Sequence, residues 1–245
     1  MKLQDIGALL RSNPYPGRMI LIGMDAAGTH AVIAYAIMGR SANSRNRVFT
    51  PKDGGIITEA ADIAKLSDPS LIIYAPVRVL GSTTIVTNGD QTDTIYEGLK
   101  SGTCFEDALR TRTFEPDAPN YTPRISGLLH RRDGGFSYQL SILKSDGGSP
   151  ASCVRFFFDY PRPAVGEGRL IHTYQGDGSP LPSFEGEPIP VAVTGSAAEY
   201  GNRIWDSLIK ENRVSLFVRS LDLVTGAAED RVFNQYQKVK SGAAV

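Results

Sequence analysis

The chain has 245 residues, which suits one large domain or two small ones and is ample for a hydrophobic core. Hydrophobic residues make up 41% and charged residues 21%, and 26 Lys and Arg match 26 Asp and Glu, so the net charge is zero. A protein that coats nucleic acid usually carries a basic excess, so this charge balance argues against that class. The two cysteines and three histidines lack paired spacing, which argues against a disulfide framework and a metal site.

The first residues, 1–6, contain an early acid and no long apolar stretch, unlike a secretory signal. No apolar run approaches the length that spans a bilayer. We therefore expect a cytoplasmic protein that does not act at a membrane.

Strands are predicted first along the chain. The apolar, partly β-branched runs at residues 19–22 and 30–38 are separated by turn residues and predict a β-hairpin. Further strands are predicted at 71–74, 77–80 and 83–87, with Pro76 marking an edge or a bend between the first two.

Two helices are expected next. Asp90 or Thr92 is placed to cap a first helix that ends at Gly102. Thr103 and Glu106 have the spacing of a capping box at the start of a second helix.

The second half of the chain returns to strands. These are predicted at residues 124–130, 136–143, 153–160 and 214–221, with a short one at 170–174 inside the Pro/Gly-rich segment 161–190 and a helix at 197–209. The order is an α+β pattern dominated by antiparallel hairpins. We expect two sheets packed face to face, with helices outside, in one domain spanning residues 1–245.

One segment, residues 39–47, is free of acids and rich in donors: Arg40, Ser41, Asn43, Ser44, Arg45, Asn46 and Arg47. If it is extended, Asn43, Arg45 and Arg47 point to one side. The planar guanidinium group matches phosphate oxygens with two parallel hydrogen bonds, so the segment is a candidate phosphate site. The alternative is a solvated loop whose arginines pair with acids elsewhere.

A second candidate segment, residues 88–93, leaves a strand and enters a helix, where backbone N–H groups and the helix dipole converge. Asn88 can donate and accept hydrogen bonds, and Asp90 and Asp93 can bind ribose hydroxyls or hold arginines of a pocket. The alternative reading of Asp90 is a plain helix cap.

A third candidate is the loop at residues 115–124, which three prolines stiffen. It carries Glu115, Asp117, Asn120 and Arg124, so it is well placed to hold reactive groups. The alternative is a tight connection with Arg124 in an ordinary ion pair.

Tyr74 closes an apolar run. The default interpretation is a core residue whose hydroxyl needs a hydrogen-bond partner.

Four segments together, residues 15–18, 39–47, 88–95 and 122–125, resemble in order and spacing the archaeal-type inosine monophosphate (IMP) cyclohydrolases and their bacterial relatives. The resemblance implies an αββα sandwich like that of the N-terminal-nucleophile hydrolases, without the nucleophile. It implies closure of the second purine ring of formylated aminoimidazole-carboxamide ribonucleotide, with loss of water, to give IMP, the last step of de novo purine biosynthesis. No metal or cofactor is implied, and the partners are purine ribonucleotides.

The resemblance also suggests roles for individual residues. Arg18, Arg45 and Arg47 would bind phosphate, and Asn43, Asn46, Asn88 and Asp90 would hold the ribose and the carboxamide. Tyr74 and Glu115 would transfer protons, and Arg40 or Arg124 would stabilise the oxyanion. Ser41, Thr92, Asp93 and Thr122 complete the expected substrate site.

Other readings remain open. The main one is a purine-nucleotide sensor that binds without catalysis. An amide hydrolase on the same fold is weakened by the missing N-terminal nucleophile, and an RNA-binding module by the zero net charge. A homo-oligomer and a functional link to a separate transformylase are compatible with the sequence.

Overall fold

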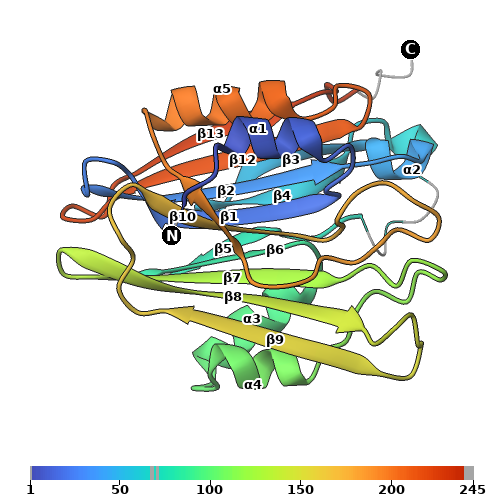
Figure 1. The fold of residues 1–245 in the computed structure, drawn as a ribbon, viewed down its shortest axis with the longest axis horizontal. Helices are drawn as coiled ribbons and strands as arrows, with labels where there is room; N and C mark the ends of the chain where they lie inside the picture. The colour runs from blue at the N-terminus through green and yellow to red at the C-terminus, as the bar shows by residue number, and fades with distance from the viewer. Residues whose placement is uncertain (1, 67–68, 70–71, 240–245) are drawn as a thin grey trace, which may run out of the picture.

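Two antiparallel sheets lie face to face in the computed structural model, which describes residues 2–66, 69 and 72–239 (Figure 1). The six-stranded sheet has the order β11-β10-β1-β2-β12-β13. Its strands are β1 (Arg18–Met24), β2 (His30–Met38), β10 (Glu167–His172), β11 (Ile189–Ala192), β12 (Arg213–Asp222) and β13 (Ala228–Asn234).

The second sheet has seven strands in sequence order, because each follows its neighbour through a hairpin or a short excursion. They are β3 (Arg47–Lys52), β4 (Gly55–Ala60), β5 (Val77–Leu80), β6 (Thr83–Thr87), β7 (Arg124–Arg132), β8 (Gly135–Ser145) and β9 (Cys153–Tyr160). The α+β expectation of two mainly antiparallel sheets is confirmed.

Helices cover the outer faces of both sheets (Figure 1). Helices α1 (Ile6–Ser12) and α5 (Ala197–Ser207) lie against the six-stranded sheet, and α3 (Gln91–Lys100) and α4 (Phe105–Arg110) lie against the seven-stranded one. Two single-turn elements, α2 (Ala42–Arg45) and η1 (Ile63–Lys65), complete the described structure.

The central strands are buried on both faces, which explains their nearly continuous apolar sequences. In β1, Ile20 and Ile22 point between the sheets, whereas Met19 and Leu21 point toward α1 and α5. The two sheets approach closely at Gly127, where an added Cβ would lie 2.9 Å from the Cδ1 of Ile22. A side chain at this position would therefore push the sheets apart.

Several local expectations were wrong. Residues 72–74 form no strand, while Leu71 lies outside the described residues; here the backbone N–H of Tyr74 donates to the side chain of Thr58 at 2.8 Å. Helix α4 begins after Cys104 without a side-chain cap, so the capping box from Thr103 does not form. Helix α3 does begin after Asp90, but that carboxylate binds arginines rather than the helix N-terminus.

Residues 43–47 do not form one extended segment either. Ser41 caps α2 through a reciprocal pair of hydrogen bonds with Ser44, and the helical turn sends Arg45 and Arg47 in different directions. The strand β3 begins only at Arg47.

One end of the sandwich collects the ends of strands from both sheets. Strand β1 begins where β2 ends, because Arg18 is opposite Ile37, and β7 begins where β6 ends, because Thr87 is opposite Ser126. This end carries α2 and lies to the right in Figure 1.

Candidate active site

Two arginines lie at this end of the sandwich, one from each sheet: Arg18 is partly buried and Arg47 is fully buried. Arg18 opens β1 and Arg47 opens β3. The side chain of Arg47 is 0% exposed; its Nε donates to the backbone oxygen of Ser44 at 2.8 Å, but Nη1 and Nη2 have no hydrogen-bond partner among the described residues. The Nε of Arg18 is likewise buried and unpartnered within that part of the chain. Burial, and then the charge of Arg18, lower the pKa of Arg47.

This pair of guanidinium groups is suited to an anion. A buried cation without a partner is strongly unfavourable, and the penalty is removed when a ligand supplies the negative charge. Guanidinium N–H groups match the oxygens of phosphate and carboxylate. The unpartnered N–H groups of Arg18 and Arg47 are therefore the part of the site that a ligand oxygen would complete.

A buried carboxyl group faces the arginines. Glu115 is 2% exposed, and burial raises its pKa to about 7 although the guanidinium groups of Arg18 and Arg124 oppose the rise. In return, burial lowers the pKa of Arg18, but the Glu115 carboxylate together with the phenols of Tyr174, Tyr15 and Tyr74 outweighs burial and raises that pKa above its usual value. A carboxyl group whose pKa lies near neutrality can exchange protons under physiological conditions.

The loop that carries Glu115 is closed by its own hydrogen bonds. The backbone N–H of Glu115 donates to the oxygen of Thr122 at 2.9 Å. The carboxylate of Asp117 accepts from the backbone N–H of Thr122 at 2.6 Å and from its hydroxyl at 2.5 Å. Asn120 accepts from the backbone N–H of Leu181 at 3.1 Å, which ties the loop to the Pro/Gly-rich segment. These hydrogen bonds close the loop on itself and connect it to the Pro/Gly-rich segment.

Phenol groups form the third component. The hydroxyl of Tyr74 is 2.7 Å from that of Tyr35, and both rings are buried. Burial raises the pKa of Tyr74, and the charges of Arg47 and Arg18 oppose that rise. Arg18, Arg47, Tyr74 and Glu115 thus act on one another electrostatically although they come from four separate segments.

Two further tyrosines at this end were not among the expected site residues. The hydroxyl of Tyr174 hydrogen-bonds with that of Thr122, and its ring stacks on Tyr15 with centroids 5.9 Å apart. Burial raises the pKa of Tyr174, although Arg18 opposes the rise. The sequence signal for Tyr174 is weak, since it is the last residue of the short strand predicted at residues 170–174, in a segment otherwise predicted as loop, and the observed strand β10 ends at His172.

The rest of the arginine-rich segment is largely engaged by the protein itself. Arg45 donates to the backbone oxygen of Gly39 at 2.9 Å and to Asn212 at 3.0 Å. Asn46 exchanges two hydrogen bonds with the backbone of Asp62, each of 2.8 Å. Both side chains therefore fasten α2 to its surroundings.

The other members of that segment lie nearer the surface. Arg40 pairs with Asp177 at 2.5 Å, and its guanidinium group lies 5.2 Å from the ring centre of Tyr15. Ser41 caps α2, and Asn43 is half-buried within it.

Asn88 and Thr92, in the second candidate segment, bind backbone and neighbouring side chains. Asn88 is 0% exposed; its amide donates to the oxygen of Pro123 at 2.9 Å and accepts from the N–H of Ile125 at 2.8 Å. The hydroxyl of Thr92 contacts that of Thr87 at 2.6 Å. These bonds hold the start of β7 against the start of α3.

The two acids of residues 88–93, Asp90 and Asp93, lie at different places in the structure. Asp90 pairs with Arg124 at 2.8 Å and with Arg112 at 2.5 Å, so it holds an arginine that also acts on Glu115. Arg124 is 6% exposed and donates to Gln91 at 2.7 Å as well.

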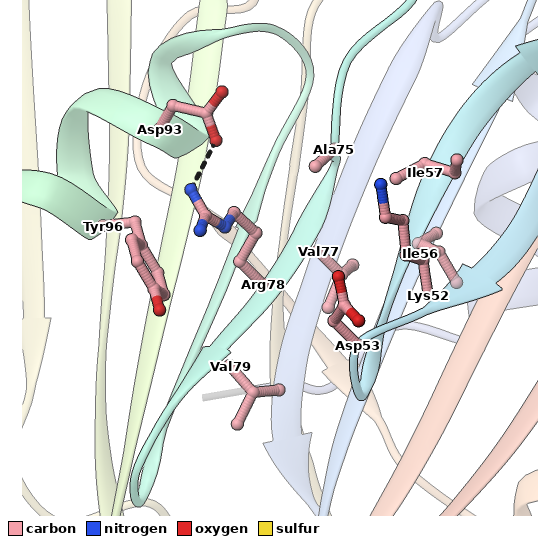
Figure 2. Close-up of a pocket in the computed structure, with 10 residues that line it drawn as sticks. All are labelled: Lys52, Asp53, Ile56, Ile57, Ala75, Val77, Arg78, Val79, Asp93 and Tyr96. Carbon is pink, nitrogen blue, oxygen red and sulfur yellow. Dashed lines mark hydrogen bonds and ion pairs between the residues drawn. The ribbon is translucent and has the colours of Figure 1, made fainter.

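Asp93 instead borders a different cavity, of about 440 Å³ (Figure 2). It pairs with Arg78 at 2.7 Å, and the Arg78 guanidinium lies 3.4 Å from the ring centre of Tyr96. Neither Arg18 nor Glu115 lines this cavity.

Two further observations concern cofactors and membranes. Within residues 2–66, 69 and 72–239, no three His, Cys, Asp or Glu side chains gather as a metal ion would require. No helix in the same ranges has both the length and the apolar character needed to cross a membrane.

The cluster of guanidinium, carboxyl and phenol groups is suited to binding a small anionic molecule and moving protons on it. A family model described as IMP cyclohydrolase-like protein matches residues 15–226. The chain belongs to this family.

Relatives are found among archaea. The chain is 27% identical over 172 residues to the IMP cyclohydrolase of Methanopyrus kandleri, covering 69% of this chain and 79% of that protein. It is 27% identical over 183 residues to that of Methanococcus aeolicus, covering 60% of this chain and 89% of the relative. It is 33% identical over 137 residues to that of Methanocella arvoryzae, covering 54% and 64% respectively.

Proposed function

We propose that this protein is an IMP cyclohydrolase, which closes the purine ring of formylated aminoimidazole-carboxamide ribonucleotide and releases water. The observation that carries the proposal is the buried set of two incompletely paired arginines, a carboxyl group titrating near neutrality and a phenol, in a chain of the IMP cyclohydrolase-like family. An intramolecular ring closure needs an anion clamp, a proton acceptor and a proton donor, and this set contains all three.

We assign the binding of the substrate phosphate to Arg18 and Arg47. A phosphate dianion matches two guanidinium charges, and both side chains retain unpartnered N–H groups within the described chain. Arg45, expected to share this role, already donates to Gly39 and Asn212, so it supports the clamp through α2.

In the first step, the carboxamide nitrogen attacks the formyl carbon. The Glu115 carboxylate accepts a proton from that nitrogen, and Tyr74 donates a proton to the formyl oxygen, which becomes a hydroxyl. Both candidate arginines pair with an acid, Arg124 with Asp90 and Arg40 with Asp177. Arg124 is assigned to the developing oxyanion because it is buried and its charge acts on Glu115, whereas Arg40 is exposed. In the second step the hydroxyl leaves as water, for which protonated Glu115 supplies the proton. The Tyr74 phenolate takes up the proton that the ring nitrogen loses as the purine is completed, so both groups return to their starting states.

The remaining features of the proposal follow from this reaction. We propose one domain over residues 1–245, in an αββα sandwich resembling that of the N-terminal-nucleophile hydrolases. The reaction places the protein in the cytoplasm, with purine ribonucleotides as substrate and product, and links it to a transformylase that would supply the formylated substrate.

A spectrophotometric assay tests the proposal directly. Purified protein mixed with the formylated ribonucleotide is expected to produce IMP well above the uncatalysed rate. Tight binding of IMP without ring closure would instead support a nucleotide sensor.

A further inference from the structure

A second tyrosine lies behind Tyr74. Tyr35 occupies the middle of β2, is 0% exposed, and stacks on Phe49 with ring centroids 5.6 Å apart. Its hydroxyl is 2.7 Å from the hydroxyl of Tyr74, which is its only hydrogen-bond partner in the part of the chain that the structure describes. A phenol at this depth keeps its hydroxyl only where that group has a partner.

The surroundings determine which hydroxyl donates. The charges of Arg18 and Arg47 act on both phenols, and guanidinium groups donate but never accept. The Tyr35 hydroxyl is fully buried and the Tyr74 hydroxyl is its only hydrogen-bond partner among the described residues, so if Tyr35 accepted in this bond its own O–H would be buried without an acceptor. Tyr35 is therefore the donor and the Tyr74 oxygen the acceptor.

Because Tyr35 donates and Tyr74 accepts in this hydrogen bond, the hydroxyl proton of Tyr74 remains available to a ligand. A phenol oxygen that already accepts from Tyr35 directs its own O–H elsewhere, and the neighbouring guanidinium groups offer it no acceptor. A substrate oxygen that enters the site would meet a donor whose direction is already set.

We propose that Tyr35 is a positioning residue, which donates its hydroxyl proton to the Tyr74 oxygen and so directs the Tyr74 proton toward the substrate. The inference rests on the proposed function. Tyr35 itself does not reach the substrate, so its influence passes entirely through Tyr74.

A double-mutant cycle on the turnover number separates this role from a structural one. The variants are Tyr35→Phe, Tyr74→Phe and the two combined; each removes only a hydroxyl. The matched control is Tyr200→Phe, because Tyr200 is also buried (1% exposed) and donates to the backbone oxygen of Ala192 at 3.0 Å, but lies in α5 on the outer face.

Tyr35→Phe is expected to lower kcat about threefold to tenfold, the usual worth of one hydrogen bond, with KM nearly unchanged. In the Tyr74→Phe background the same substitution is expected to have no further effect on kcat. Tyr200→Phe is expected to leave kcat unchanged in either background.

The outcomes distinguish the two proposals. If Tyr35→Phe lowers kcat equally in both backgrounds, or not at all, the positioning role is wrong while ring closure stands. If the wild-type protein does not close the ring, the proposed function itself fails, and the role of Tyr35 fails with it.

Discussion

Replacing Glu115 by Gln keeps the size and shape of the side chain but removes its charge. The carboxyl group is 2% exposed, and burial raises its pKa from 4.5 to about 7. Because this group titrates differently in the folded and unfolded chains, it makes stability depend on pH, and the glutamine variant should lose that dependence.

The sign and the size of this pH effect on stability follow from the pKa of Glu115 in the folded protein and in the unfolded chain. Between pH 4.5 and about 7 the folded protein binds more protons at this site than the unfolded chain does. The stability that the group contributes is therefore complete below pH 4.5 and is lost as the pH rises through about 7. At about 1.4 kcal/mol for each pH unit between the two pKa values, the loss amounts to about 3 kcal/mol.

Urea denaturation of both proteins at about pH 4.5 and about pH 8.5 measures this effect. The free energy of unfolding of Glu115→Gln, relative to wild type, should increase by about 3 kcal/mol from the lower to the higher pH. An equal difference at both pH values would refute a raised pKa for Glu115.

The same substitution tests catalysis. Wild-type kcat/KM should rise with pH through about 7, because the proton acceptor must be ionised. Glu115→Gln should lower kcat about a hundredfold to ten-thousandfold and lack this acidic limb.

Three further substitutions test the other components. Tyr74→Phe should lower kcat by about a hundredfold with little change in nucleotide affinity, measured by steady-state kinetics and calorimetry; wild-type turnover would exclude Tyr74 as the proton donor. Arg47→Met should weaken IMP binding by at least about tenfold. It should also raise the free energy of unfolding by about 1–3 kcal/mol, because it removes a buried cation with unpartnered N–H groups. A less stable variant with unchanged IMP affinity would contradict the anion site. Asn88→Ala should reduce the free energy of unfolding in urea by about 3 kcal/mol, since Pro123 and Ile125 lose their partners; a loss below about 0.5 kcal/mol would show that these bonds contribute little.

Long strands were predictable because their residues repeat a simple burial pattern. Strands β1, β2 and β7 carry unbroken or alternating apolar residues, and the structure places them as expected. The β3–β4 hairpin was not predicted, although Asp53-Gly54 is a typical hairpin turn, because Pro51 and the short apolar runs beside it give a weak strand pattern. The turn of α2 was not predicted because it has only four residues and carries Ser44 where a capping box usually has Glu or Gln.

The candidate site was only partly predictable for a different reason. The segments that carry Arg18, Arg47 and Glu115 each showed a local signal in arginine or proline content. Which donors remain unpartnered is decided by distant residues; Asn212, which engages Arg45, is 167 positions away along the chain. Tyr35 gave no signal, because a tyrosine between alanines in an apolar strand has the same pattern as any core residue.

The origin of the two arginines in different sheets has a mechanical consequence. Arg18 moves with the six-stranded sheet and Arg47 with the seven-stranded one. If a phosphate binds between them as proposed, it would be a removable crosslink between the sheets, and a ligand at a hundred times its Kd would stabilise the folded state by about 2.7 kcal/mol. Any sliding of one sheet over the other would separate Arg18 from Arg47 before either sheet unfolds. Loss of phosphate binding would therefore show that the interface between the sheets has been disturbed.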